Sequence, residues 1–119
     1  METPFVTVVN LISAESSLAF DKAKEYMDVV QVYSKLGSEN PEADWREGFK
    51  TMHNIFGCDK KFTNVFQYYL YDIEETITGN NAIVLFKYKN DNRSIKYILE
   101  KRQNKWIVIA IERKNGQNN

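Results

Sequence analysis

Apolar residues in the first part of the chain recur at helical spacing. The chain opens with Thr3-Pro4, a typical helix start, because a threonine side chain accepts a hydrogen bond from a free backbone N–H and proline at the first helical position loses none. The apolar positions that follow at intervals of three or four residues are Phe5, Val8, Val9 and Ile12. This spacing predicts a helix over about 3–15 with one apolar face.

Two further helices are predicted by the same spacing. Residues of about 18–33 carry apolar side chains on one side and charged ones mostly on the other, but a short strand over 29–33 fits the pattern as well. Asn40-Pro41 then begins, and Gly57 ends, a helix over about 41–56. Its apolar stripe consists of Trp45, Phe49, Met52, Ile55 and Phe56. We expect the first three of these side chains to be largely buried against a sheet.

After Gly57 the pattern changes from helical spacing to alternation. The strand-like segments, rich in Tyr, Ile, Val, Phe and Thr, are 66–78, 82–89, 94–102 and 106–113. The turns between them are short, and a parallel crossover needs roughly a dozen residues, so the strands are antiparallel neighbours. The sequence therefore predicts a four-stranded meander over about 62–114. Both faces of the last strand are apolar, which predicts a central strand or one covered twice.

Helices followed by a long antiparallel sheet define an α+β domain. A sheet of this length twists and curls, so we expect three N-terminal helices packed in the concave side of a curved antiparallel sheet, a cone with an open mouth. Residues 1–115 are predicted to form this single domain, and 116–119 a disordered polar tail.

Four segments resemble those of a known family. Residues 5–12 are similar to an opening helix, and 19–26 to an acidic, alanine and aromatic pattern. Residues 79–84 (GNNAIV) resemble a turn and "A-x-V" strand, and 104–108 (NKWIV) a final "gKW-x-V" strand. These are features of the nuclear-transport-factor-two-like family, which includes SnoaL-like and ketosteroid-isomerase-like proteins.

The resemblance covers nearly the whole chain and implies a cystatin-like cone. It also implies dimerisation, since such domains often pair through the sheet. The family contains isomerases, hydrolases, cyclases, transport adaptors and dimerisation modules, so the fold does not imply one activity. The acids and tyrosine of the isomerases have no matching position in this chain.

Composition and charge exclude several classes of function. The 16 basic and 16 acidic residues balance, so no global field attracts nucleic acid or an anionic membrane. No apolar run approaches the roughly 20 residues of a membrane span. Cys58 is the only cysteine, no zinc-site spacing occurs, and nucleotide-binding motifs are missing, so we expect neither metal nor cofactor. The N-terminus has no basic region of a secretory signal, which predicts a cytoplasmic protein or an exported domain whose signal was removed.

A few residues could carry chemistry. His53, the only histidine, is a candidate general base at the cone mouth, but a lone histidine is more often a surface or structural residue. Asp72 and Glu74 point to the same face of a strand, where they form either an acid–base pair or an ordinary solvated charged face. Cys58 is either a weakly activated thiol or an inert cysteine at a helix end.

Aromatic side chains are the main candidates for a binding site. Together with His53, they are predicted to line a pocket for a small apolar ligand, with phenol hydroxyls as polar groups, or else to form plain core and dimer interface. The predicted ligand-binding residues are Tyr26, Trp45, Phe49, His53, Tyr69, Tyr71 and Phe86.

Two classes of function fit these features. The first is a non-catalytic module that binds a small ligand or a protein, or that dimerises. The second is a cofactor-independent enzyme of the isomerase or cyclase type that uses His53 or a strand carboxylate. We favour the first because the chain has one histidine and no matched set of acids. A pocket with a desolvated carboxyl or histidine beside a tyrosine hydroxyl would favour the second.

Assembly is predicted from the same strands. The apolar side chains on both faces of the last strand would leave one set exposed, which soluble monomers seldom tolerate. We therefore expect a homodimer through the sheet face, with a two-fold contact that covers this set.

Overall fold

The computed structural model describes residues 2–56 and 70–115. Predictions that concern Cys58, Tyr69, the start of the meander and the tail at 116–119 lie outside these residues. The elements in chain order are α1 (Pro4–Ser16), α2 (Phe20–Ala23), α3 (Val29–Lys35), α4 (Pro41–Phe56), β1 (Tyr71–Thr78), β2 (Asn81–Tyr88), β3 (Ser94–Arg102) and β4 (Lys105–Lys114).

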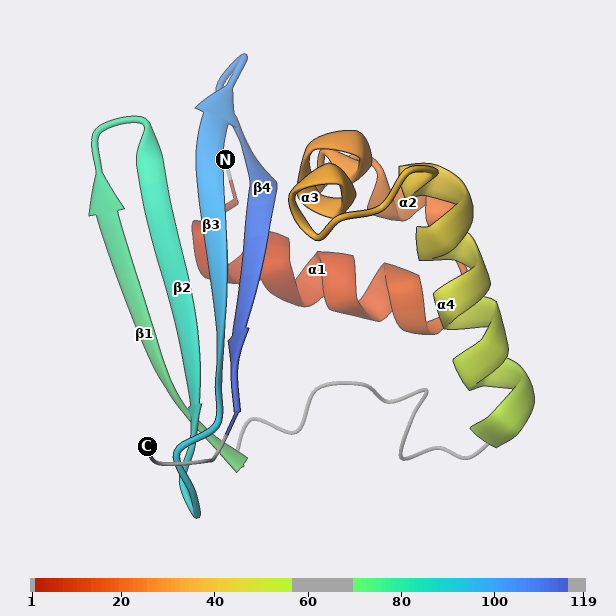
Figure 1. Cartoon of the computed structure of the whole chain (residues 1–119). Coiled ribbons are helices and arrows are strands. Elements are labelled where there is room, and N and C mark those ends of the chain that lie inside the picture. Colours follow the sequence, from red (N-terminus) through yellow and green to blue (C-terminus); the bar gives the residue numbers. More distant parts are fainter. Residues whose placement is uncertain (1, 57–69, 116–119) are drawn as a thin grey trace.

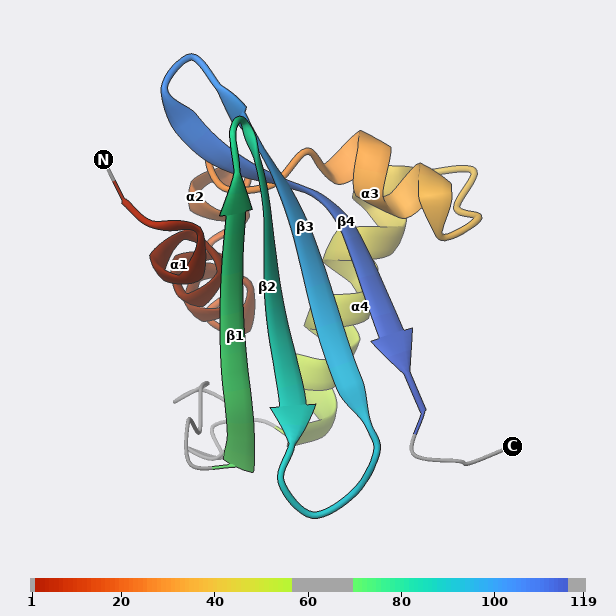
Figure 2. The ribbon, with the colours of Figure 1, turned by 90° about the vertical axis from the view of Figure 1, so that its left-hand side faces the viewer.

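The architecture is α+β, as predicted. The four strands form one antiparallel, curved and unclosed sheet in the order β1-β2-β3-β4, which confirms the meander. All four helices lie on one side of the sheet, and α1 crosses its inner face (Figure 1). None of the described helices covers the outer face, which is seen in Figure 2. Among the described residues, no helix is long and apolar enough to span a bilayer.

The predicted second helix is interrupted. Instead of one helix over about 18–33, the chain forms α2 and α3, and residues 29–33 are helical. Between the two helices, Met27 forms a parallel bridge with Val108 of β4. Asp28 N–H donates to the Val108 carbonyl at 2.9 Å, and Val108 N–H donates to the Tyr26 carbonyl at 2.8 Å. The Asp28 side chain then caps α3 by accepting from Gln31 N–H at 3.0 Å. A tertiary contact thus replaces one turn of the expected helix.

The last strand is at the edge of the sheet, so its predicted central position is wrong. The bridge from Met27 covers part of this edge. The apolar side chains on both faces of β4 result from a β-bulge at Ile109. The bulge is seen in the pairing, since Ile98 pairs with Ala110 whereas Leu99 pairs with Val108. Beyond the bulge the alternation is reversed. As a result the inward-facing residues of β4 are Trp106, Val108, Ile111 and Arg113.

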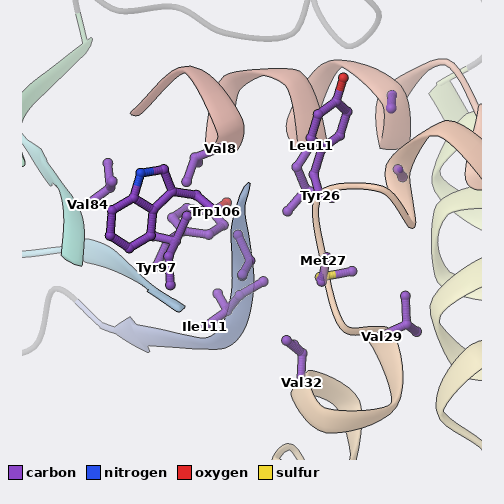
Figure 3. Packing of buried hydrophobic residues seen from close by; sticks show 14 of the residues in the cluster. Val8, Leu11, Tyr26, Met27, Val29, Val32, Val84, Tyr97, Trp106 and Ile111 are labelled. Atoms are coloured by element: carbon purple, nitrogen blue, oxygen red, sulfur yellow. The ribbon is translucent and has the colours of Figure 1, made fainter. Parts of the chain in front are cut away.

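The core lies between α1, α3 and the inner face of the sheet (Figure 3). Figure 3 shows Val8 of α1 facing Trp106 of the sheet, with Leu11 of the same helix beside Tyr26. The buried stripe of α1 consists of Pro4, Thr7, Val8, Leu11, Ala14 and Glu15, which is displaced from the predicted one. Apolar side chains at successive helical turns therefore join the helix to the sheet.

The prediction for α4 holds only in part. Trp45 is fully buried and Phe49 is half-buried against the core, but Met52 is 46% exposed. The expected burial of Met52 is wrong because α4 packs mainly against α3 rather than in the hollow of the sheet. The inner face of the sheet is already occupied by α1 and α3, and α4 forms a layer behind them (Figure 1).

Candidate functional site

A pocket of about 190 Å³ lies between α1, α4 and the inner face of the sheet. We call it the Glu15 pocket. Its walls are mostly aromatic and aliphatic, with one carboxyl and one guanidinium group among them. The lining residues are Ile12, Glu15, Ser16, Phe49, Tyr71, Phe86, Ile95, Tyr97 and Arg113. Every strand and two helices contribute, so the pocket exists only in the folded chain.

Glu15 is the buried carboxyl group of the pocket. It lies near the end of α1 with 6% of its surface exposed, and its Oε2 accepts a hydrogen bond of 2.7 Å from the Trp45 indole nitrogen. Burial raises the pKa of Glu15 from 4.5 to about 7, against the opposing effects of the Trp45 hydrogen bond and the Arg113 charge. At neutral pH this carboxyl therefore exchanges between its acid and its carboxylate form, as a general acid or base requires.

Two tyrosines, Tyr71 and Tyr97, line the pocket together with Glu15, and the charge of Glu15 also acts on Tyr33 outside it. Burial, and secondarily the charge of Glu15, raises the pKa of Tyr97 well above its usual value and that of Tyr33 to about 12. Burial and a 3.3 Å hydrogen bond to Tyr88 raise the pKa of Tyr71 to about 12. These phenols stay protonated at physiological pH, so they are hydrogen-bond donors rather than bases. The ring of Phe86 makes edge contacts with Tyr71 and Tyr97, at centroid distances of 5.8 and 5.5 Å.

The β-bulge in β4 brings Arg113 to the pocket. Arg113 pairs with Ile95 of β3, and both side chains line the pocket. Without the extra residue at Ile109, strict alternation would place Glu112 on this face and turn Arg113 outward. The bulge therefore sets the charge at the pocket mouth.

The structure brings together only part of the predicted ligand-binding set. Phe49, Tyr71 and Phe86 line the Glu15 pocket, and Trp45 lies behind it as the hydrogen-bond donor to Glu15. The other two described residues, Tyr26 and His53, do not line it. Tyr26 is buried below the ammonium groups of Lys22 and Lys105, and His53 is half-buried near the end of α4.

The strand carboxylates that were weighed as an acid–base pair lie elsewhere. Asp72 and Glu74 are exposed on β1 and point away from the helices. Glu74 forms a 2.6 Å ion pair with Lys87, its neighbour on β2. The placement is that of a solvated charged face. In the described part of the chain, no group of three or more His, Cys, Asp or Glu could hold a metal ion.

Sequence reasoning missed Glu15 and Arg113 as site residues. A signal for Glu15 was present, because it lies seven residues after Val8 and four after Leu11, on the apolar stripe of the first helix. A lone carboxyl on such a stripe must be buried, and a buried carboxyl needs a partner. Nothing in the sequence indicates the bulge, so the inward position of Arg113 could not be predicted.

A second hollow, of about 400 Å³, lies at the edge of β4 beside the Met27 bridge. Its charged side chains are paired with one another or with neighbours. Arg102 binds Asp28 at 2.8 Å, and Lys24 binds Glu42 at 2.7 Å. We regard the Glu15 pocket as the candidate site because, unlike the hollow at the edge of β4, it combines apolar walls with a buried titratable group.

Comparisons with protein-family models, with curated proteins and with solved structures give no match to this chain.

Proposed function

We propose that the chain is a binding domain for a small, mainly apolar molecule, which occupies the Glu15 pocket. The observation that supports this most is the composition of the pocket, in which aliphatic and aromatic walls enclose one carboxyl and a few hydroxyl groups. A few polar groups in an apolar cavity give a ligand its orientation. An apolar cavity of roughly 150 Å³ takes up benzene, so about 190 Å³ suits one ring with a small substituent.

Filling the pocket tests this proposal. Ile95→Trp adds bulk at a lining position, whereas Ile77→Trp adds the same bulk at a position of β1 that is 52% exposed and does not line the pocket. We expect one-ring alcohols and ketones to shift amide resonances of wild type and of Ile77→Trp, but not of Ile95→Trp. If no one-ring compound binds the wild-type protein, or if Ile95→Trp binds as well as wild type, the pocket is not the site.

A second candidate function is proton transfer by Glu15 on the bound molecule. The desolvated carboxyl beside tyrosine hydroxyls is the feature that distinguishes the enzyme hypothesis from the binding module. In an isomerase of this type, the Glu15 carboxylate would remove a proton from the carbon next to a ketone and return it at a second carbon. The Tyr97 hydroxyl, which also lines the pocket, would donate to the ketone oxygen.

The test is double-bond migration in a small unsaturated ketone such as 3-cyclohexenone, followed by ultraviolet absorbance. Because the base must be ionised, the rate should rise with pH up to about 7 and then level off. Glu15→Gln should abolish this rate and keep ligand binding, and the control Glu47→Gln, on the exposed face of α4, should match wild type. An equal rate in Glu15→Gln would refute catalysis and leave the binding proposal intact.

We further propose that the chain forms a homodimer through the outer face of the sheet. The support is a row of apolar side chains there, with no described helix over it. Ile83 is 38% exposed, and Ile98, Ile107 and Ile109 are half-buried. The bulge turns Ile111 inward, so this patch is smaller than the one expected from the sequence.

Light scattering tests the dimer. We expect about twice the 14.0 kDa chain mass at tens of micromolar, and loss of the dimer in Ile83→Lys. The control is Ile77→Lys, a change at an exposed isoleucine of β1 whose neighbours are on the inner face. A wild-type mass near 14.0 kDa would refute the proposal.

A further inference from the structure

Among the described residues, Arg113 is the one cationic group that lines the Glu15 pocket. Within the described residues its guanidinium forms no ion pair, although the preceding residue, Glu112, pairs with Lys96 at 3.8 Å on the outer face. Arg113 lowers the pKa of Glu15, but burial outweighs it and the two groups form no ion pair. The pocket thus presents a guanidinium with donors unused by the described chain, beside a carboxyl that accepts from Trp45.

The bulge at Ile109 is the reason that a guanidinium lies in the pocket. It reverses the alternation of β4 and directs Arg113, rather than Glu112, to the inner face. Bulges that direct a side chain in this way are common beside functional sites. A guanidinium presents a planar fork of N–H donors that matches the two oxygens of a carboxylate. The apolar walls beside it, formed by Ile12, Ile95 and Phe86, exclude a ligand that is charged throughout.

We propose that the Glu15 pocket takes a small monocarboxylic acid, in which a body of about one ring fills the apolar part and the carboxylate binds Arg113. The inference rests on the proposed binding function and adds the ligand class to it. A cavity of about 190 Å³ leaves room for one ring and one carboxylate but not for a second ring. The one guanidinium among the described lining residues matches one negative charge.

Binding of such an acid is coupled to a proton. In the described part of the chain, the groups that face Glu15 are Trp45 of α4, Tyr33 of α3, Tyr97 of β3 and Arg113 of β4, of which Arg113 carries a charge at neutral pH. When the ligand carboxylate occupies Arg113, the cation no longer favours the ionised form of Glu15, and a second anion opposes it. Glu15 therefore takes up a proton and donates it as a hydrogen bond inside the pocket.

The experiment compares benzoate with benzyl alcohol, a neutral molecule of nearly the same shape, by calorimetric or NMR titration at pH 6. We expect benzoate to bind wild type at least tenfold more tightly than benzyl alcohol. Arg113→Gln should remove this preference, so that the two probes bind the variant with similar affinity. The control is Lys114→Gln, which removes the same charge from the next residue of the strand, on the other face, and should keep the preference.

A second readout follows the proton. Benzoate affinity for wild type should fall as pH rises above 7, and titrations in two buffers of different ionisation enthalpy should give proton uptake. Glu15→Gln should bind benzoate without either effect. Equal affinity of the two probes, or an unchanged preference in Arg113→Gln, would overturn the carboxylate site and leave the proposed binding function standing. If neither probe binds wild type, both proposals fail.

Discussion

Glu15 makes the stability of this protein decrease with rising pH, the reverse of what an ion-paired carboxyl does. In the folded state the pKa of Glu15 is about 7, because burial disfavours the carboxylate, and 4.5 is its ordinary value. Between these two values the folded chain holds a proton that the unfolded chain has released. The stabilisation is therefore complete below pH 4.5 and is lost as pH rises through about 7.

The magnitude follows from the interval between the two pKa values. Each pH unit within it changes the free energy of unfolding by about 1.4 kcal/mol. From 4.5 to about 7, wild type should lose about 3 kcal/mol of stability through this group. Glu15→Gln removes the titration but keeps an oxygen that accepts from Trp45. We expect the variant and wild type to have similar stability near pH 4.5 and the variant to be more stable by about 3 kcal/mol near pH 8.5.

The assay is urea unfolding at several pH values, followed by tryptophan fluorescence, since Trp45 and Trp106 are both buried. The difference between wild type and variant cancels the other titrating groups. Glu47→Gln is the matched control, because the Glu47 side chain is 72% exposed, and its curve should run parallel to that of wild type. A pH-independent difference between wild type and Glu15→Gln would refute the assignment of a desolvated carboxyl.

Three further changes have expected outcomes, all measured by urea unfolding. Trp45→Phe removes the hydrogen-bond donor to Glu15. The resulting loss of free energy of unfolding should be about 1–2 kcal/mol larger at pH 8.5 than at pH 5, because a hydrogen bond to a carboxylate is stronger than one to a neutral carboxyl. A pH-independent loss would contradict this. Phe49→Ala should cost about 1–3 kcal/mol, less than a fully enclosed phenylalanine, because the ring is half-buried, and a wild-type midpoint would show that it contributes nothing to the core. Asp28→Ala removes the cap of α3 and an ion pair with Arg102, with an expected loss of about 1–2 kcal/mol at pH 7. Because Arg102 lowers the pKa of Asp28 below 3.8, this loss should shrink as pH falls below that value, and equal losses at pH 7 and pH 3 would be evidence against the pair.

Local sequence determined most of the element boundaries. Thr3 accepts a 3.1 Å hydrogen bond from Val6 N–H at the start of α1, and Pro41 begins α4, as their residue types predict. Gly79 adopts a φ of +63° in the turn between β1 and β2. Caps and turns involve neighbours within a few residues, so the preferences of single residues suffice to predict them. Alternation and short turns were enough to predict the meander.

Tertiary contacts decided where those local preferences were overruled. Residues 26–28 have the composition of a helix, but pairing with Val108 of β4 satisfies their backbone groups instead. The bulge at Ile109 depends on how β3 and β4 pair, and no residue type in this segment predicts it. Burial of Met52 was wrongly expected because a helical stripe indicates one apolar side but not which neighbour is already packed against the sheet.

The grouping of the site residues belongs to the tertiary structure. Glu15, Trp45 and Arg113 are separated by 30 residues or more, and no sequence motif links them. The chain by itself determined that a charged residue lies on the apolar stripe of the first helix. Only folding decided that this carboxyl loses its water, gains an indole N–H and lies in a pocket with a guanidinium, because desolvation and charge act through space and not along the chain.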